Sequence, residues 1–273
     1  MTDSAPHETA PSGTPHPFAA AIRLAALGEG RFAGRTTEAY RNMVGPYGGI
    51  TAAVMLQALL QRPERLGGPV PLTVNYAGPV RGREFEIATR EIRTSRSTQH
   101  WFAEMRQGPQ GEVSTTATAV FGTRRDTWHH TEARQPALPA RESIAALRSS
   151  THAPWSERYE RRTVDDLEAG ESRGWLTDLP ARPLDFPGLA SLCDAFRPWI
   201  FARRRQRTPI GTVTLNVYFH AAADELAAIG ATPLQGVACT NTIHRGFFDQ
   251  EAQVWTPDGR LLATTQQVVW FKE

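Results

Sequence analysis

The chain has 273 residues, of which 40% are hydrophobic, and its 30 basic and 28 acidic side chains leave a formal net charge of +2. This length predicts two domains, or one domain built of two halves, and twelve Phe and seven Trp supply bulky core material. The near balance of charge argues against a nucleic-acid-binding protein, which would collect a basic excess on one face.

The sequence also argues against several other classes of protein. No apolar run approaches the roughly 20 residues that cross a bilayer, and the first residues lack the basic-then-apolar layout of a secretion signal. Two cysteines, Cys193 and Cys239, cannot make a disulfide framework, and no CxxC or HxxxH spacing indicates a metal site. We therefore expect a cytoplasmic protein that binds no membrane, no nucleic acid and no metal.

Composition divides the chain into four segments. Residues 1–17 are rich in Ser, Thr, Pro and His and have little to bury, so we expect a disordered tail. Two structured domains are expected over residues 18–124 and 155–273. Between them, residues 125–154 are more polar and lose apolar periodicity, which is typical of a linker.

The strongest local signal is an apolar helix over residues 48–60, with the sequence GGITAAVMLQALL. Pro46 and the glycine pair Gly48–Gly49 mark its start, and its Ala, Met and Leu residues favour helix. Because only Thr51 and Gln57 interrupt the apolar surface, this helix must be enclosed on nearly every side.

Alternation of apolar and polar residues follows this helix in four runs. These runs predict strands over residues 72–77, 84–90, 100–106 and 113–121. Together they indicate an antiparallel sheet with one buried face. A buried helix followed by such strands predicts a sheet wrapped around its helix, the hotdog arrangement.

The second half repeats this plan. A helix is expected over residues 188–196, and strands are expected over 212–220, 234–242, 247–255 and 261–271. In the last hairpin Gly111 falls on Gly259, an offset of 148 positions. This long repeat indicates duplication of one unit. The predicted fold class is therefore α+β, with two tandem hotdog domains, each an antiparallel sheet wrapped around a central helix.

Four segments carry a family resemblance, in the order VGPYGGITAAVMLQALL, LTVNYAGPV, TLNVYFH and LLATTQQVVWF. They resemble the thioesterase-like superfamily, and within it the acyl-CoA thioesterase II (TesB-like) proteins with two hotdog domains in one chain. The resemblance covers roughly residues 18–273 and implies hydrolysis of acyl-CoA thioesters, in lipid metabolism, with no metal or organic cofactor. It also implies a homo-oligomer, a dimer of double hotdogs joined through their sheets.

In that family the attacking water is held by an Asp, a Thr and a Gln of the second half. Gln267 fits the glutamine of this motif, and Thr240 or Thr242 fits its threonine. Thr214 occupies the position of the aspartate, with Asn216 two residues on, and both are candidates for contact with the substrate. This departure leaves an alternative function open, a non-catalytic acyl-CoA-binding protein of the same fold.

Asp194 is the carboxylate that the sequence offers as a replacement. It lies in SLCDAF, which is similar to the central helix of single-hotdog thioesterases of the phenylacetate-pathway type, where the catalytic Asp lies. Pro198 removes the intrahelical partner of the Asp194 carbonyl, so we expect a kink there. Partial burial would raise the pKa of this carboxyl toward that of a general base. The alternative is an ion pair with Arg197 on a solvated edge.

The repeat predicts that only the second half carries this carboxylate. Gly49 falls on Gly188 at an offset of 139 positions, so Met55 occupies the position of Asp194 in the first half. Gln267 lies on the inward face of its strand, where a buried amide needs partners that a water or the substrate carbonyl would supply, the alternative being a structural pairing.

The start of the first helix is a candidate site for the developing oxyanion. The free N–H groups of Gly48 and Gly49 would bind it, and the missing Cβ atoms would let a thioester approach; the alternative is a tight turn. We expect Gly49 to take part in catalysis and Gly48 to contact the substrate, in an apolar slot where the two halves meet.

An arginine run follows the second helix, with Arg203, Arg204, Arg205 and Arg207. We take Arg203 as a candidate for binding the phosphates of coenzyme A, and a solvated charge run is the alternative. A third function, hydration of enoyl-CoA, would need an Asp–His pair, and the sequence has no D-x-N-P-x-H segment.

Overall fold

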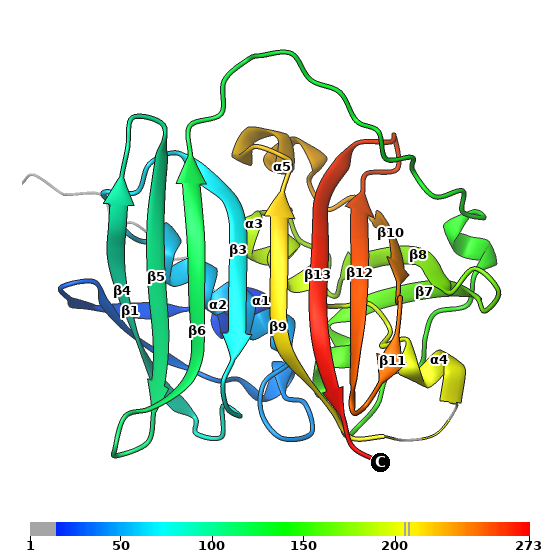
Figure 1. The fold of residues 1–273 in the computed structure, drawn as a ribbon, viewed down its shortest axis with the longest axis horizontal. Helices are drawn as coiled ribbons and strands as arrows, with labels where there is room; N and C mark the ends of the chain where they lie inside the picture. Colours follow the sequence, from blue (N-terminus) through cyan, green and yellow to red (C-terminus); the bar gives the residue numbers. More distant parts are fainter. Residues whose placement is uncertain (1–14, 205, 207) are drawn as a thin grey trace, which may run out of the picture.

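A computed structural model describes residues 15–204, 206 and 208–273 (Figure 1). Over these residues the first half contributes β1 (Leu24–Gly28), β2 (Arg31–Arg35), β3 (Gly68–Tyr76), β4 (Glu84–Thr94), β5 (Thr98–Gln107) and β6 (Glu112–Gly122). The four strands expected in this half correspond to β3–β6. The sequence did not predict β1 and β2.

The second half contributes β7 (Tyr159–Asp166), β8 (Glu171–Asp178), β9 (Ile210–Phe219), β10 (Leu234–Cys239), β11 (Ile243–His244), β12 (Phe247–Trp255) and β13 (Leu261–Phe271). The four strands expected here correspond to β9, β10, β12 and β13, and β10 ends three residues earlier than predicted. The strands β7, β8 and β11 were not predicted.

All described strands belong to one antiparallel sheet. Twelve of them lie in the order β1-β2-β4-β5-β6-β3-β9-β13-β12-β10-β8-β7, and β11 pairs with β12. The two halves therefore meet at a single strand pair, β3 with β9, in the middle of the sheet (Figure 1). The predicted α+β class, with one sheet unit for each half, is confirmed.

The helices are α1 (Pro17–Ala21), α2 (Gly48–Leu60), α3 (Phe186–Leu192), α4 (Ile200–Arg204) and α5 (Ala223–Ile229), with 3₁₀ turns at Glu38–Tyr40, Arg141–Ser143 and Pro154–Glu157. Helix α2 has the predicted bounds. Ten of its thirteen residues are buried, as its apolar surface requires. Helices α2 and α3 lie behind the sheet and pack against each other where the two halves join (Figure 1).

The second central helix is shorter than predicted. It ends at Leu192, and Asp194 lies in the following turn, where its N–H donates to the carbonyl of Ser191 at 3.2 Å. Pro198 cannot donate to the Asp194 carbonyl, so the helix does not continue beyond this turn. The sequence predicted a kink inside a continuous helix, whereas the structure shows the end of a helix before Asp194.

The register of the central strand pair decides which side chains face the helices. Leu72 pairs with Val217 and Val74 with Leu215, and all four side chains are fully buried on the helix side. Their neighbours along both strands point to the opposite, uncovered face. Any side chain that acts together with the central helices must therefore share the face of Leu215 and Val217.

The segment between the halves, from residue 123 to residue 158, contains short 3₁₀ turns and isolated bridges in place of longer helices or strands. It arches from the end of β6 past the ends of the central strands and reaches the second half (Figure 1). The domain bounds expected from the sequence stay a prediction, and the tail prediction falls mostly on residues 1–14, which lie outside the described residues.

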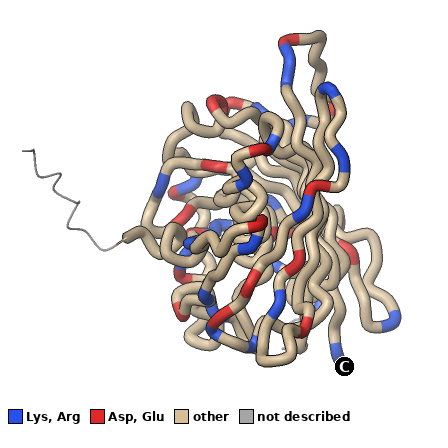
Figure 2. The backbone as a smooth tube through the Cα atoms, turned by 90° about the vertical axis from the view of Figure 1, so that its left-hand side faces the viewer, with Lys and Arg blue, Asp and Glu red and all other residues tan. Residues whose placement is uncertain are grey.

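Basic and acidic residues are interspersed along the backbone in the view of Figure 2, as the balanced composition leads one to expect. Among the helices of the described residues, none combines the length and the apolar character that crossing a bilayer requires.

Candidate active site

Asp194 lies where the end of α3 meets the beginning of α2. A Cβ atom on Gly48 would lie 2.7 Å from the Oδ2 atom of Asp194, so only glycine allows this close approach. The N–H of Gly49 donates to the Asp194 carboxylate. The carboxylate of the second half is therefore held at the positive end of the helix of the first half.

Gln267 is the second partner of Asp194. It lies on the inner face of β13, is 4% exposed, and its side chain forms a hydrogen bond with the Asp194 carboxylate. An amide can donate to a carboxylate only through Nε2, which leaves its Oε1 free. That Oε1 is buried and has no hydrogen-bond partner among the described residues. The site thus holds an unused acceptor beside a carboxylate.

The surroundings of Asp194 shift its protonation equilibrium. Burial raises its pKa to about 7, and the hydrogen bonds from Gly49 and Gln267 lower it only in part. The residue keeps part of its surface accessible, as do Gly48 and Tyr76 beside it. A carboxyl with such a pKa exchanges protons near neutral pH, as a general base must.

Tyr76, at the end of β3, forms the wall of the site on the side of the first half. Its hydroxyl donates to the carbonyl of Gly48 at 2.8 Å, and the oxygen of that hydroxyl would lie 3.5 Å from a Cβ on Gly48. Burial and the Asp194 charge raise the pKa of Tyr76 well above its ordinary value. It therefore stays a neutral phenol and anchors the first turn of α2.

Two tyrosines hold the turn that carries Asp194. The hydroxyl of Tyr47 donates to the carbonyl of Ser191 at 2.9 Å, the same oxygen that accepts from the Asp194 N–H. The hydroxyl of Tyr159 lies 2.6 Å from Ser191 Oγ. Tyr47 also stacks on Trp155, with ring centroids 4.1 Å apart. The short helix α3 thus owes the position of its end to buried contacts from both halves.

Gln250 extends the polar row beside Gln267. The two residues pair directly across β12 and β13, and Gln250 is 2% exposed. Its Oε1 accepts from the backbone N–H of Trp199 at 3.1 Å. Two neighbouring glutamines therefore bind the segment after α3, one at Asp194 and the other five residues later.

The structure places the predicted threonine, Thr240, two strands away from Gln267. Thr240 follows β10, and two strand spacings, about 10 Å, separate β10 from β13. Its Oγ1 is buried and has no hydrogen-bond partner among the described residues. The strand β12, which carries Gln250, lies between them. Thr242 is exposed beyond the end of β10, and its N–H donates to Asp249.

Thr214 and Asn216 lie on the other face of the sheet. Leu215 and Val217 between and beside them are fully buried on the helix side, so the two predicted substrate contacts point away from Asp194. This placement corrects their grouping with Asp194. A carboxylate at position 214 would likewise face away from α3.

The role predicted for Gly49 is also corrected. Its N–H donates to Asp194, so it is not free to bind an oxyanion. A Cβ on Gly49 would lie 2.5 Å from the carbonyl oxygen of Ser191, which shows how closely α2 and α3 pack. This close packing replaces the predicted apolar slot at that point of the junction. The N–H of Gly48, the first of the helix, has no intrahelical acceptor.

One alternative from the sequence is resolved by a contact, whereas the role of Arg203 stays a prediction. Arg197 pairs with Asp165 of β7, so Asp194 does not form the ion pair expected as the alternative to catalysis. Arg203 is exposed on α4, with its guanidinium carbon 5.5 Å from the ring centre of Trp199. Of the same run, Arg205 and Arg207 lie outside the described residues.

Four residues of the site escaped sequence analysis: Tyr47, Tyr76, Ser191 and Gln250. Tyr47 directly precedes the glycine pair, and this position at a helix start was an available signal. Tyr76 and Gln250 contact residues of their own half, and Ser191 contacts Tyr47 of the other half. All three contacts depend on tertiary packing, which no local pattern reveals. Cys193, next to Asp194, is fully buried, and burial raises the pKa of its thiol, so it is an inert core residue.

A metal site is not part of this arrangement. Over the described residues, no group of three His, Cys, Asp or Glu side chains is placed to hold a metal ion. The groups that converge are the carboxylate of Asp194, the side-chain amide of Gln267, the phenol of Tyr76 and the first backbone N–H groups of α2. Such a set can hold and activate a water molecule next to an electrophilic carbonyl.

Comparison with known proteins identifies the family. The model of the acyl-CoA thioesterase C-terminal domain matches residues 130–271, and that of the N-terminal domain matches residues 37–122. Among curated proteins, none matches the chain.

Solved structures give the same fold. A hot dog-fold protein of unknown function from Alicyclobacillus acidocaldarius is 43% identical, with a TM-score of 0.90 over 95% of this chain and 99% of that one. An acyl-CoA thioesterase II from Mycobacterium marinum is 15% identical, with a TM-score of 0.75 over 93% of this chain and 98% of that one. The resemblance noted in the sequence is confirmed, and the chain belongs to the acyl-CoA thioesterase family.

Proposed function

We propose that this protein hydrolyses acyl-CoA thioesters with a water molecule that Asp194 activates. The observation that carries the proposal is the enclosed carboxylate of Asp194, held between the start of α2 and Gln267 with its pKa raised to about 7. Membership of the acyl-CoA thioesterase family supports the class of reaction. The assignment of roles to individual residues is our inference from the geometry.

The water molecule would be bound by two acceptors. One of its protons points to Asp194, and the other points to the unpartnered Oε1 of Gln267. Both acceptors are fixed by the protein, because Gln267 Nε2 also binds Asp194 and the turn of Asp194 is tied to Tyr47. Such fixed positions orient the lone pair of the water toward the substrate.

Hydrolysis then proceeds with a balanced transfer of one proton. Asp194 takes a proton from the water as its oxygen bonds to the thioester carbonyl carbon. The tetrahedral intermediate collapses as the carbon–sulfur bond breaks, and Asp194 returns the proton to the departing sulfur. The products are a free carboxylic acid and coenzyme A, and Asp194 regains its charge.

The negative charge that develops on the carbonyl oxygen needs a donor other than Gly49. The N–H of Gly48 is the suitable candidate, because it is the first amide of α2 and the helix dipole adds to its positive potential. Gly48 also lies directly beside the Asp194 carboxylate. In this assignment Gly49 holds the base and Gly48 binds the oxyanion.

The test uses the purified full chain with acyl-CoAs of several chain lengths, both aliphatic and aromatic, and follows release of the free thiol. We expect turnover with at least one of them. Absence of turnover above background with all of them would remove the enzymatic proposal. The binding-only alternative predicts that an acyl-CoA binds without release of the thiol.

A further inference from the structure

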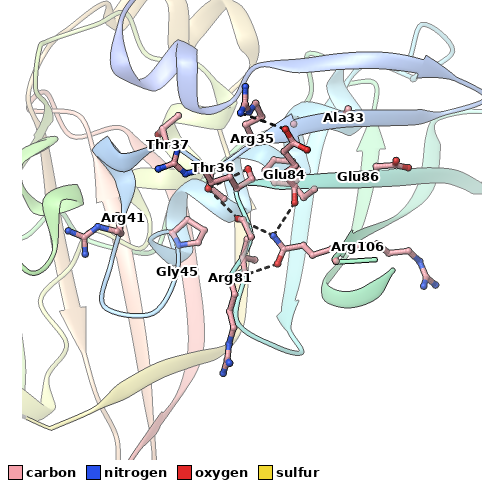
Figure 3. Close-up of a pocket in the computed structure, with 18 of the residues that line it drawn as sticks. Ala33, Arg35, Thr36, Thr37, Arg41, Gly45, Arg81, Glu84, Glu86 and Arg106 are labelled. Carbon is pink, nitrogen blue, oxygen red and sulfur yellow. Dashed lines mark hydrogen bonds and ion pairs between the residues drawn. The ribbon is translucent and has the colours of Figure 1, made fainter. Parts of the chain in front are cut away.

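A groove of about 1460 Å³ runs along the first half of the molecule (Figure 3). Its lining includes the end of β2, residues 41–46 before α2, the β3–β4 turn and the β5–β6 turn, together with Arg23 and its neighbours before β1. The hydrolytic step proposed at Asp194 does not account for this groove or for the charges along it.

The groove carries an excess of positive charge. Six arginines and three glutamates line it, namely Arg23, Arg35, Arg41, Arg81, Arg83, Arg106, Glu38, Glu84 and Glu86. Each glutamate lies within 4.0 Å of an arginine, in the pairs Glu38–Arg41, Glu84–Arg35 and Glu86–Arg31. Among the described residues, no carboxylate lies within this distance of Arg23, Arg81 or Arg83. These three charges are available to an anionic ligand.

The turn that carries Arg81 and Arg83 is exposed and yet firmly held. Gln107 Oε1 accepts from the N–H of Arg81 at 3.1 Å, and its Nε2 donates to the carbonyl of Gly82 at 3.3 Å. On the other side, the N–H of Thr36 donates to the carbonyl of Arg83 at 2.7 Å. Figure 3 shows Thr36 and Arg81 of this network beside the groove. A backbone fixed in advance lowers the entropy lost when a ligand binds its side chains.

The groove reaches the start of the active-site helix. Pro46 lines it, and Gly48, two residues later, lies against Asp194. Near this end, Met43 and Val44 are 57% and 66% exposed, so apolar surface lies beside the arginines. A ligand with phosphates, an aromatic base and a long flexible arm would find a partner for each part.

We propose that this groove binds the nucleotide end of coenzyme A, with Arg81 and Arg83 paired with its phosphates. The inference rests on the proposed function, because the acyl-CoA substrate supplies both the phosphates and the arm that carries the thioester past Pro46 to Asp194. Arginine suits phosphate because its planar fork donates two parallel hydrogen bonds. This assignment moves the phosphate site from Arg203 of the second half to the first half.

The first experiment measures binding without catalysis. Titration calorimetry with coenzyme A and with 3′-phosphoadenosine 5′-diphosphate compares the native chain with the double variant Arg81→Ala/Arg83→Ala. We expect both ligands to bind about ten-fold more weakly to the variant, since two phosphate contacts are lost. The unfolding temperature should stay unchanged, because both side chains are exposed. Arg96→Ala, in the exposed β4–β5 turn, is the matched control and should bind as the native chain does.

The second experiment separates recognition of the nucleotide from chemistry. For an acyl-CoA that is turned over, KM should rise about ten-fold in the double variant while kcat stays unchanged. For the N-acetylcysteamine thioester of the same acyl group, which lacks the phosphates, both parameters should match those of the native chain.

Native affinity for coenzyme A in the double variant would overturn the proposal, and so would an equal loss in Arg203→Ala. Failure of the hydrolytic function is distinguishable from these results. Suppose that the native chain hydrolyses no thioester, but that coenzyme A binding is lost when Arg81 and Arg83 are replaced. This result would contradict the proposed hydrolysis and support the binding of coenzyme A in the groove.

Discussion

The two halves share one plan but differ at the position that carries the chemistry. In the first half Met55 is fully buried within a helix of 13 residues. In the second half the helix has 7 residues, and Asp194 follows its end. The shorter helix exposes a turn, and that turn can present a carboxylate to another helix. The longer one presents only apolar side chains.

The strands that face the two central helices also differ, with an apolar pair in the first half and a polar pair in the second. Trp101 pairs with Ala119 in the first half, and both are buried apolar residues. In the second half Gln250 pairs with Gln267 at the matching place, and each amide binds the segment after α3. An apolar pair supports a long helix, whereas a polar pair fixes an irregular segment. In the proposed site, the second half therefore supplies both polar side chains that hold the water.

The site nevertheless needs both halves. Asp194 and Gln267 come from the second half, while Gly48, Gly49 and Tyr76 come from the first. In the proposed site, the start of α2 thus supplies backbone N–H groups, and the turn after α3 supplies the base. Duplication within one chain permits this asymmetry, since each copy can change separately.

The largest effect is expected when the base is removed. Asp194→Asn keeps the size of the side chain and takes away its charge, so kcat should fall by about 10²–10⁴-fold. Thiol release from an acyl-CoA measures the loss. Activity equal to that of the native chain would remove Asp194 from the mechanism.

Asp178 supplies a matched control for this variant. It is 5% exposed, burial raises its pKa to about 7, and it lies 3.5 Å from Arg182 and not beside α2. Asp178→Asn should keep kcat within about three-fold of the native value. An equal loss in both variants would show that any buried carboxylate matters, and would contradict the asymmetry of the halves.

Introducing a carboxylate at the matching position of the first half should destabilise the protein and should not create a second site. Met55→Asp places the charge on a fully buried position of α2, where no helix start faces it. The free energy of unfolding should fall by about 3–5 kcal/mol, measured with denaturant. Met43→Asp, at a 57% exposed position, should change it by less than about 0.5 kcal/mol. A stable and active Met55 variant would mean that the halves remain interchangeable.

Removing the second acceptor of the water, Gln267, should lower kcat less than removing Asp194 does. Gln267→Met keeps the shape of the side chain but removes both amide atoms, so kcat should fall by about 10–100-fold. Gln266→Met is the matched control, because Gln266 is the exposed neighbour on the opposite face of β13. Loss of activity in both variants alike would point to damage of the strand and not to a role at the site.

The sequence predicted the parts of the fold whose residues carry their own pattern. Helix α2 was found because a continuous apolar surface must be enclosed on nearly every side. Gln267 was chosen from the family resemblance, and the alternation along its strand placed it on the inward face. The edge strand β7, with the polar sequence YERRTVDD, lacks an alternation of that kind and was missed. Thr214 was misplaced because a shift of one residue in a strand exchanges its faces. Likewise, the contact between Tyr47 and Ser191 spans 144 positions.

The pH dependence of activity tests the state of the base. Asp194 must be charged to accept a proton, so kcat/KM should rise about ten-fold per pH unit below pH 7 and level off above it. In Gln267→Met the midpoint should move upward, because a hydrogen bond that favours the charged form is lost. A flat profile from pH 5 to about pH 9 would contradict the assignment.

Stability should depend on pH through the same group. The folded pKa of Asp194, about 7, lies above its ordinary value of 3.8, so the folded chain holds the proton more tightly than the unfolded chain. The contribution of this tighter proton binding to the free energy of unfolding is full below pH 3.8 and is lost as the pH rises through 7. Asp194→Asn has no such proton to lose. It should therefore unfold at a higher temperature than the native chain at pH 8, and this advantage should vanish in acid.

The smallest expected effect concerns the tie between the halves. Tyr47→Phe removes the hydroxyl that binds the carbonyl of Ser191 at 2.9 Å and keeps the stack on Trp155. The free energy of unfolding should fall by about 0.5–1.5 kcal/mol. Because the same carbonyl accepts from Asp194 N–H, kcat should also fall, by about three- to ten-fold, with KM unchanged. Tyr218→Phe, on the exposed sheet face, should alter neither quantity. A loss of stability with kcat unchanged would make Tyr47 a packing residue only, and the turn of Asp194 would then be positioned by Gly49 and Gln267 alone.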